Sequence, residues 1–148
     1  MRRHPKLQPV SRQHRKMLML AQLLKKGAPP YKGLPLTPEG KIEYAIGLFV
    51  NLIAKHFEIE EHYLFNTLVG TEDLNLLVEE LKADHQLLKE LFHKLNPLEP
   101  DLDLMDELGH LLEKHIRKEE REYFQIAQQE KKEVLQNLSL PLEDAQSK

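Results

Sequence analysis

A short phrase that combines histidine and glutamate occurs twice in the sequence, first as KHFEIEE and later as KHIRKEE. Each copy places a glutamate four residues after its histidine, and the resulting pairs are His56 with Glu60 and His115 with Glu119. Four residues on an α-helix turn about 400° and rise about 6 Å, so the two members of each pair share one helix face. Two such helices facing each other would direct two imidazoles and two carboxylates at a common centre. Mixed nitrogen and oxygen ligands suit iron, manganese or zinc better than magnesium or calcium.

The apolar stripes of the predicted helices carry six polar side chains in all. A single histidine on an apolar face is more often a hydrogen-bonded core residue than a ligand. Six polar side chains together need another explanation, because even one uncompensated buried polar group costs roughly 1–3 kcal/mol, and a buried charge costs more. A pair of divalent cations would satisfy all six at once, with glutamates bridging and two histidines for each metal. We therefore predict these metal ligands: His14, His56, Glu60, His85, His115 and Glu119.

Several other polar residues close to the repeats receive a plainer interpretation. Glu61 and Glu120 each lie five residues after a candidate histidine, and we interpret both as parts of solvated helix faces. Tyr63 and Tyr123 lie about one turn after the two candidate glutamates. We predict both to be core tyrosines, with a hydrogen bond to a bound oxygen species as the alternative.

Length and composition fit one globular domain. The chain has 148 residues, of which 41% are hydrophobic and 30% are charged, and this length suffices to bury a core. The absence of cysteine excludes disulfides, thiolate metal sites and cysteine nucleophiles. The first ten residues lack the apolar segment of a secretory signal, and no apolar run approaches the roughly 20 residues of a membrane span. We expect a cytoplasmic protein with no membrane partner.

The charge is unevenly distributed along the chain. Nine of the 21 Lys and Arg residues precede the first acidic residue, Glu39. A basic leading segment can bind nucleic acid or anionic lipid, or it can pack against acidic neighbours within the same bundle. We favour packing and expect no nucleic-acid partner, because no aromatic or glycine-rich interleaving accompanies the cations.

The apolar periodicity predicts four helices and no strands. Their expected starts, each at or beside a good capping residue, are Ser11, Thr37-Pro38, Thr71 or Asp73, and Asp101 or Asp103. Short links between amphipathic helices favour an all-α, up-down-up-down antiparallel four-helix bundle. A short extra helix is expected within 134–140. The predicted organisation is a basic N-terminal extension (1–10), the bundle (11–130), and a short helix with a flexible tail (131–148).

At these residues the chain resembles the hemerythrin-like, or HHE cation-binding, family. The resemblance extends from His14 to about Phe124 and rests on a histidine in the first and third helices and His-x3-Glu in the second and fourth. It implies a four-helix bundle that holds a non-haem di-iron centre. It also implies reversible O2 binding, sensing of O2, NO or iron, or iron handling.

The sequence departs from the O2-carrying hemerythrins at two places. Their third helix carries His-x3-His, whereas Lys89 occupies the second place here, and their fourth helix uses His-x4-Asp, whereas Glu119 lies at the fourth place and Glu120 at the fifth. The chain is therefore more similar to the bacterial and regulatory branch of the family. Fewer histidines leave more positions for water, O2 or NO.

The resulting hypothesis is a non-haem di-iron protein that binds or senses O2, NO or iron, with a protein partner unspecified. It assigns His14 and His56 to one iron and His85 and His115 to the other, with both glutamates bridging. Zinc or manganese are alternative metals, since ligand type alone does not exclude them. The rival functions are a di-iron enzyme, which would reduce peroxide or NO or oxidise iron as ferroxidases do, and a metal-free helical interaction module.

Overall fold

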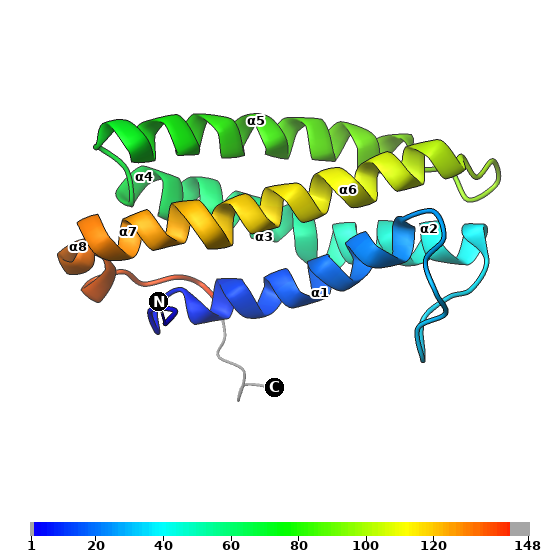
Figure 1. The fold of residues 1–148 in the computed structure, drawn as a ribbon, viewed down its shortest axis with the longest axis horizontal. Helices are drawn as coiled ribbons and strands as arrows, with labels where there is room; N and C mark the ends of the chain where they lie inside the picture. Colours follow the sequence, from blue (N-terminus) through cyan, green and yellow to red (C-terminus); the bar gives the residue numbers. More distant parts are fainter. Residues whose placement is uncertain (1, 143–148) are drawn as a thin grey trace.

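The computed structural model describes residues 2–142, and all regular secondary structure in this range is helical (Figure 1). Five helical segments are present, and the long ones run along the long axis of the molecule, an arrangement compatible with a helical bundle. The first and third are α1 (Gln8–Leu24) and α5 (Glu72–Lys94). The short last one is α8 (Lys132–Gln136). Helix α1 packs along α6, which also packs against α5.

The second and fourth segments each contain π-helical turns, which hold one more residue than an α-turn. The second runs without a break through α2 (Pro38–Leu48), η1 (Phe49–Ile53), α3 (Ala54–Ile59), η2 (Glu60–Leu64) and α4 (Phe65–Thr67). The fourth runs through α6 (Leu102–Lys118), η3 (Glu119–Tyr123) and α7 (Phe124–Glu130). The turns η2 and η3 begin at the glutamates of the two repeated phrases. Such π-turns inside α-helices are frequent at functional sites.

Three of the predicted helix starts carry the expected cap. The side chain of Thr37 accepts a hydrogen bond from the backbone N–H of Gly40, and Pro38 follows in the first turn. The side chains of Thr71 and Asp101 accept equivalent bonds at the starts of α5 and α6. Each cap satisfies one of the N–H groups that a helix start leaves without an intrahelical partner.

Helix α1 begins earlier than the predicted start at Ser11. Pro9 stands in its first turn, where the missing N–H of proline costs nothing. The buried Leu7 and Val10 tie this part of the chain to the core, and the backbone N–H of Leu7 donates to the carbonyl of His4. Ordered chain therefore precedes His14 by more than one turn, which brings His14 level with the histidines of the other helices.

The C-terminal part agrees with the prediction of a short extra helix. Helix α8 begins two residues before the expected range of 134–140 and ends at Gln136, and Leu135 and Leu138 are buried. The predicted flexible tail lies, from residue 143 onward, outside the described residues.

The hydrophobic core is divided into two clusters, and each draws on all four long helical segments. One cluster includes Met17, Ile53, Leu88 and Leu112, and the other includes Val10, Leu64, Leu81 and Tyr123. Along each segment a candidate ligand stands between the two sets, as His85 does between Leu81 and Leu88. A polar layer thus separates two apolar halves.

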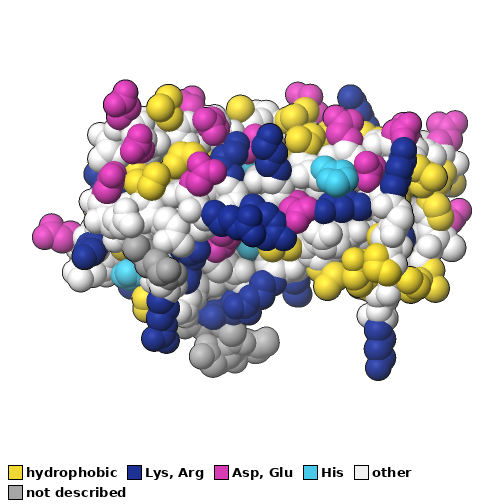
Figure 2. Space-filling model, viewed as in Figure 1, with side chains coloured by type: hydrophobic (Ala, Val, Ile, Leu, Met, Phe, Trp, Pro, Cys, Tyr) yellow, Lys and Arg dark blue, Asp and Glu magenta, His cyan; other side chains and the backbone are white. Residues whose placement is uncertain are grey.

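Basic and acidic side chains occupy different parts of the surface. On the face shown in Figure 2, Lys and Arg gather around the middle, where α6 passes α1, while Asp and Glu are frequent over α5. Three of the nine cations that precede Glu39 pair with acids of the fourth segment, in agreement with the packing interpretation. These pairs are Arg3–Glu120, Lys25–Glu113 and Lys26–Asp103. In the part of the chain that the structure describes, no helix combines the length and apolarity that crossing a membrane requires.

Candidate metal centre

The six predicted ligands converge in the polar layer, and each is at most 2% exposed. They come from all four long segments: α1, α3 and η2, α5, and α6 and η3. Potential ligand atoms lie within 4.8 Å of one another in two groups. One group is His14, His56, Glu60 and Glu119, and the other is Glu60, His85 and His115. Glu60 belongs to both groups, as a bridging carboxylate would.

The distances show how Glu60 spans the two groups. Its Oε2 lies 3.0 Å from Nε2 of His56 and 3.3 Å from Nε2 of His14. Its Oε1 lies 3.1 Å from Nε2 of His85. The second carboxylate, Glu119, also reaches both sides, with Oε1 3.2 Å from Nε2 of His14 and 3.8 Å from Nε2 of His115.

Four atoms at this centre have no hydrogen-bond partner although they are buried. They are Nε2 of His56, Nε2 of His115 and both carboxylate oxygens of Glu119. His56 Nε2 is close to Glu60, but without the geometry of a hydrogen bond. Buried polar atoms are almost always paired, and leaving one unpaired costs roughly 1–3 kcal/mol. Metal ions bound by these atoms would satisfy them, so the residues at this centre fit a metal site.

Each histidine is oriented by a bond from its other ring nitrogen. Nδ1 lies 2.6 Å from Glu120 in His14, 2.6 Å from Gln13 in His56, 2.7 Å from Glu61 in His85 and 3.0 Å from Asp84 in His115. A carboxylate or amide oxygen only accepts, so Nδ1 donates in each case. The lone pair of the neutral ring is then on Nε2, which faces the centre. Outer acceptors of this kind orient metal-binding histidines and raise their basicity.

The two repeats are related by an approximate two-fold symmetry that includes these outer contacts. The last glutamate of each repeat, Glu61 or Glu120, accepts from a histidine on α5 or α1, respectively. The phenylalanine at the corresponding place stacks on that same histidine, Phe65 on His85 and Phe124 on His14. The residue before each of those histidines accepts from the histidine of the other repeat, Asp84 from His115 and Gln13 from His56. The repeated phrase therefore encodes matching halves of the site.

Apolar side chains close the centre against water. Phe57 stacks on His85 with ring centroids 4.0 Å apart and meets His115 edge-on. Phe57, Phe65 and Phe124 are all at most 2% exposed.

The predictions for the two tyrosines have different outcomes. Tyr123 is a core residue, and its hydroxyl donates to the backbone carbonyls of Leu64 and Leu68. Tyr63 is 37% exposed, so its prediction as an inward residue is wrong. The cause is η2, because its additional residue rotates the helix and turns Leu64 inward in place of Tyr63.

The two central carboxyls differ in charge. Burial raises the pKa of Glu60, but His56 and the other bonded neighbours outweigh it, so its pKa lies well below the usual range. Burial and the nearby Glu60 raise the pKa of Glu119 well above its usual range. Without a cation, Glu60 therefore loses its proton first and Glu119 keeps its proton to higher pH, because two bare carboxylates at this separation repel each other.

Two of the histidines likewise have pKa values that are shifted in opposite directions. Burial lowers the pKa of His85, but its bonds to Glu60 and Glu61 more than compensate, so the pKa rises to about 9. Burial and the neighbouring His85 outweigh Asp84 at His115, and its pKa falls to about 4. The metal-free centre thus holds protons in places where a metal would compete with them.

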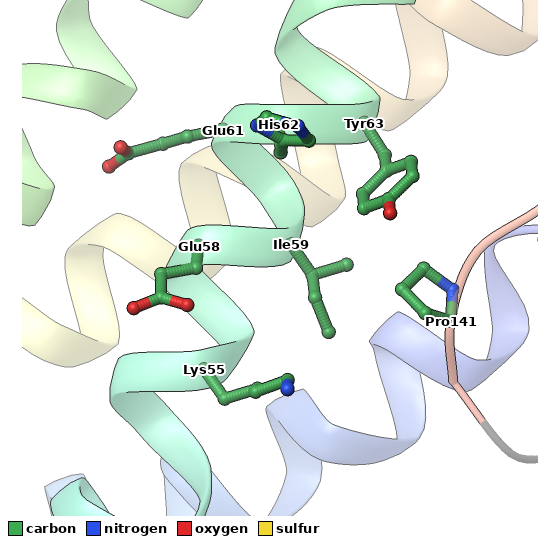
Figure 3. Close-up of a pocket in the computed structure, with 7 residues that line it drawn as sticks. All are labelled: Lys55, Glu58, Ile59, Glu61, His62, Tyr63 and Pro141. Atoms are coloured by element: carbon green, nitrogen blue, oxygen red, sulfur yellow. The ribbon is translucent and has the colours of Figure 1, made fainter.

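Two cavities lie beside the centre. A cavity of about 70 Å³ between α5 and α6 is lined by three leucines and by Asp84, Lys114, His115 and Lys118. It has room for one or two waters or a diatomic molecule. A larger one of about 590 Å³ lies on the outer side of η2 (Figure 3). There Ile59, Tyr63 and Pro141 surround one space, while Glu61 points to the opposite side of the helix, toward α5.

Sequence reasoning found the six central residues but missed the four outer acceptors. Glu61 and Glu120, interpreted as solvated, have side chains only 31% and 23% exposed and bind the histidines. Gln13 and Asp84 were not singled out at all. The available signal is positional, because each outer acceptor is the immediate neighbour of a candidate ligand and bonds to a histidine on another helix.

The described part of the chain is helical, and its core contains two buried His/Glu groups that could hold a metal ion. These features define a helical protein with a candidate metal site in its core. The family model described as the hemerythrin HHE cation-binding domain matches residues 7–127. The chain therefore belongs to this family. No curated protein and no solved structure matched the sequence.

Proposed function

We propose that the protein binds two iron ions in the polar layer and uses them to bind or sense a small ligand such as O2 or NO. His14 and His56 would hold one ion and His85 and His115 the other, with Glu60 and Glu119 between them. The main support is the set of four buried atoms that lack a hydrogen-bond partner and belong to residues of the two candidate ligand groups. Family membership supports metal binding in the same way.

The proposed architecture is an up-down-up-down four-helix bundle. It is supported by the way each long segment contributes one side of the polar layer and one part of each apolar cluster. Carboxylate-bridged dimetal sites are typically built in such bundle cores.

The residues of this chain would hold the centre and control what reaches it. Iron, when bound, supplies redox chemistry and positions open to a small ligand. The Nδ1 bonds orient the four rings, and Phe57, Phe65 and Phe124 exclude water. The cavity beside His115 offers a small ligand an approach between α5 and α6. Because His115 and Asp84 line it, a ligand there meets the histidine from its outer side.

Metal analysis of natively purified protein is the first test. We expect about two iron ions per chain, and a Glu60→Ala variant should lose most of them because it removes the carboxylate shared by both groups. The matched control is Glu58→Ala, which removes an exposed carboxylate two residues away. A protein that is purified without metal and is equally stable in chelator would support the interaction module. Zinc or manganese in place of iron would show that the predicted metal is wrong.

The ligand is tested by loading Fe(II) without air and then admitting O2 or NO while the optical spectrum is recorded. We expect a new visible band that one equivalent of ligand saturates. Repeated consumption of peroxide or NO would instead favour the enzyme alternative. Iron as the metal, O2 or NO as the ligand and a cytoplasmic location stay predictions until then.

A further inference from the structure

A third pocket lies at the end of the molecule where the N-terminal arm (residues 2–7) lies near α7 and α8 (Figure 1). Its volume is about 710 Å³. The polar residues that characterise its lining are Arg2, Arg3, His4, Gln8, Lys132 and Gln136. No acidic residue is among the described residues that line it. The pocket is therefore rich in cations and amide groups, and it is distinct from the metal centre.

The arm that forms one wall of this pocket is held in place by Gln128, which is 8% exposed. Its amide nitrogen donates to the backbone carbonyl of Arg2, and its amide oxygen accepts from the backbone N–H of His4. Arg3 Nη1 donates to the same oxygen over 3.1 Å. The wall is thus built by specific bonds and exists before any ligand binds.

The cations of the pocket differ in whether they have partners. Arg3 is engaged, since its Nη2 donates to a carboxylate oxygen and to the backbone carbonyl of Glu120, and its guanidinium lies over the ring of Phe124. The side chains of Arg2 and Lys132 are exposed and make no hydrogen bond or ion pair with any described residue. Two positive charges therefore line the same hollow without a counter-charge from any residue of the range 2–142.

We propose that this pocket binds a small anion with at least two negative charges, either a dicarboxylate or a phosphate ester. Arginine presents a planar fork of donors that matches carboxylate and phosphate oxygens, and lysine adds a point charge. Ligand pockets for small molecules typically measure about 300–1,000 Å³. A hollow of this size fits a small molecule better than the extended backbone of a nucleic acid.

Arg3 connects this pocket to the metal centre, and this part of the proposal rests on the proposed function. Glu120, which Arg3 binds, also accepts from Nδ1 of His14 over 2.6 Å. An anion that shares the charge of Arg3 leaves Glu120 a stronger acceptor, which makes Nε2 of His14 a better metal ligand. The anion and the metal should therefore each strengthen the binding of the other, and by the same factor.

Calorimetric titration of the metal-free full chain tests the pocket itself. The probes are succinate and phenyl phosphate, with acetate as the monovalent control. We expect saturable binding of at least one probe with a dissociation constant below about 1 mM. A Lys132→Gln variant should weaken it about tenfold, whereas Lys131→Gln, which removes the same charge from a residue that does not line the pocket, should not.

Three results would overturn the pocket proposal. They are no saturation by either divalent probe, equal weakening by Lys131→Gln and Lys132→Gln, and tighter binding of a single-stranded RNA that Lys132→Gln abolishes. The coupling is measured separately, as the zinc affinity with and without succinate. We expect a rise of several fold in the wild type and none in Arg3→Gln. An unchanged zinc affinity refutes the coupling, while a chain that binds succinate but no metal refutes the proposed function and keeps the pocket.

Discussion

At the scale of single residues, the outer acceptors make the two halves of the centre unequal. The symmetry of the repeats pairs Gln13 with Asp84, so His56 donates to a neutral amide while His115 donates to a carboxylate. A carboxylate acceptor makes an imidazole the better donor to a cation. Asp84 also accepts from Lys118 over 3.1 Å, which fixes its position. The half that contains His85 and His115 should therefore bind its metal more tightly.

Asp84→Asn tests this inequality. Loss of the carboxylate should lower the metal affinity of this half by about 10–100-fold, since outer partners of histidine ligands contribute that much. Competition with a chromophoric chelator measures it for each metal equivalent. The control is Glu80→Gln, which removes another carboxylate that pairs with Lys118 but touches no histidine. Equal affinities in Asp84→Asn and the wild type would contradict the inequality.

The protons held by the metal-free centre predict how its stability depends on pH. The pKa of His85 is raised to about 9, from about 6.5 when unfolded, so its contribution is complete below pH 6.5 and lost as the pH rises to 9. The raised pKa values of His14 and Glu119 act in the same direction. Chelator-treated protein should lose on the order of 3 kcal/mol of its free energy of unfolding between these pH values.

Urea denaturation at pH 6.5 and pH 9 measures that loss. His85→Gln removes one of these titrating groups and should reduce the dependence by the part that His85 contributes. Metal displaces the protons, so metal-loaded protein should show little dependence, and metal binding at pH 7 should release protons to the buffer. A metal-free protein that becomes more stable toward pH 9 would disprove the assignment of these protons.

The central residues were predictable because each stands out against an apolar stripe. His85, for example, lies between Leu81 and Leu88, and it is informative because five further polar residues share the inward faces of the four helices. The outer acceptors lack this contrast, since Glu61 and Asp84 lie on partly exposed faces where charged residues are common. Their role depends on which neighbouring helix passes close by, and one helix's sequence does not contain that information.

At the scale of elements, the π-turns explain where the periodicity failed. A regular α-helix continues the stripe from Glu60 to Tyr63 and Thr67, and both are exposed. The structure turns Leu64 and Leu68 inward instead, because η2 accommodates one more residue in the turn. Helix existence and caps were predictable from local residues, whereas a π-turn depends on the packing that it serves.

The close approach of α1 and α6 gives a prediction at this scale. A Cβ added at Gly109 would lie 2.6 Å from the backbone carbonyl oxygen of Ala21, which cannot move without shifting α1. Gly109→Ala should therefore destabilise the chain by about 1–3 kcal/mol, although alanine is the better helix former. Gly47→Ala is the control, because nothing lies within 4 Å of its added Cβ. It should stabilise by up to about 1 kcal/mol in the same denaturant titration.

At the scale of the whole molecule, the polar layer lies between two apolar clusters that could otherwise form one continuous core. Without a cation the layer contains unpaired atoms of His56, His115 and Glu119 and two carboxyls in close proximity. The layer is thus the weakest part of an otherwise well-packed interior. Every long segment passes through this layer. Whether the layer holds a cation should therefore affect the stability of both apolar clusters.

Metal binding should therefore stabilise the whole fold and not only the site. A ligand that binds only the folded state adds about 2.7 kcal/mol to the free energy of unfolding at a free concentration 100 times its dissociation constant. The unfolding temperature should therefore rise as metal is added. The shift should be absent in Glu60→Ala, which lacks the carboxylate shared by both groups. Hydrogen exchange should slow in both apolar clusters together, because each long segment crosses the layer between them. If added metal left the unfolding temperature unchanged, or protected one cluster alone, the layer would not join the two halves of the core.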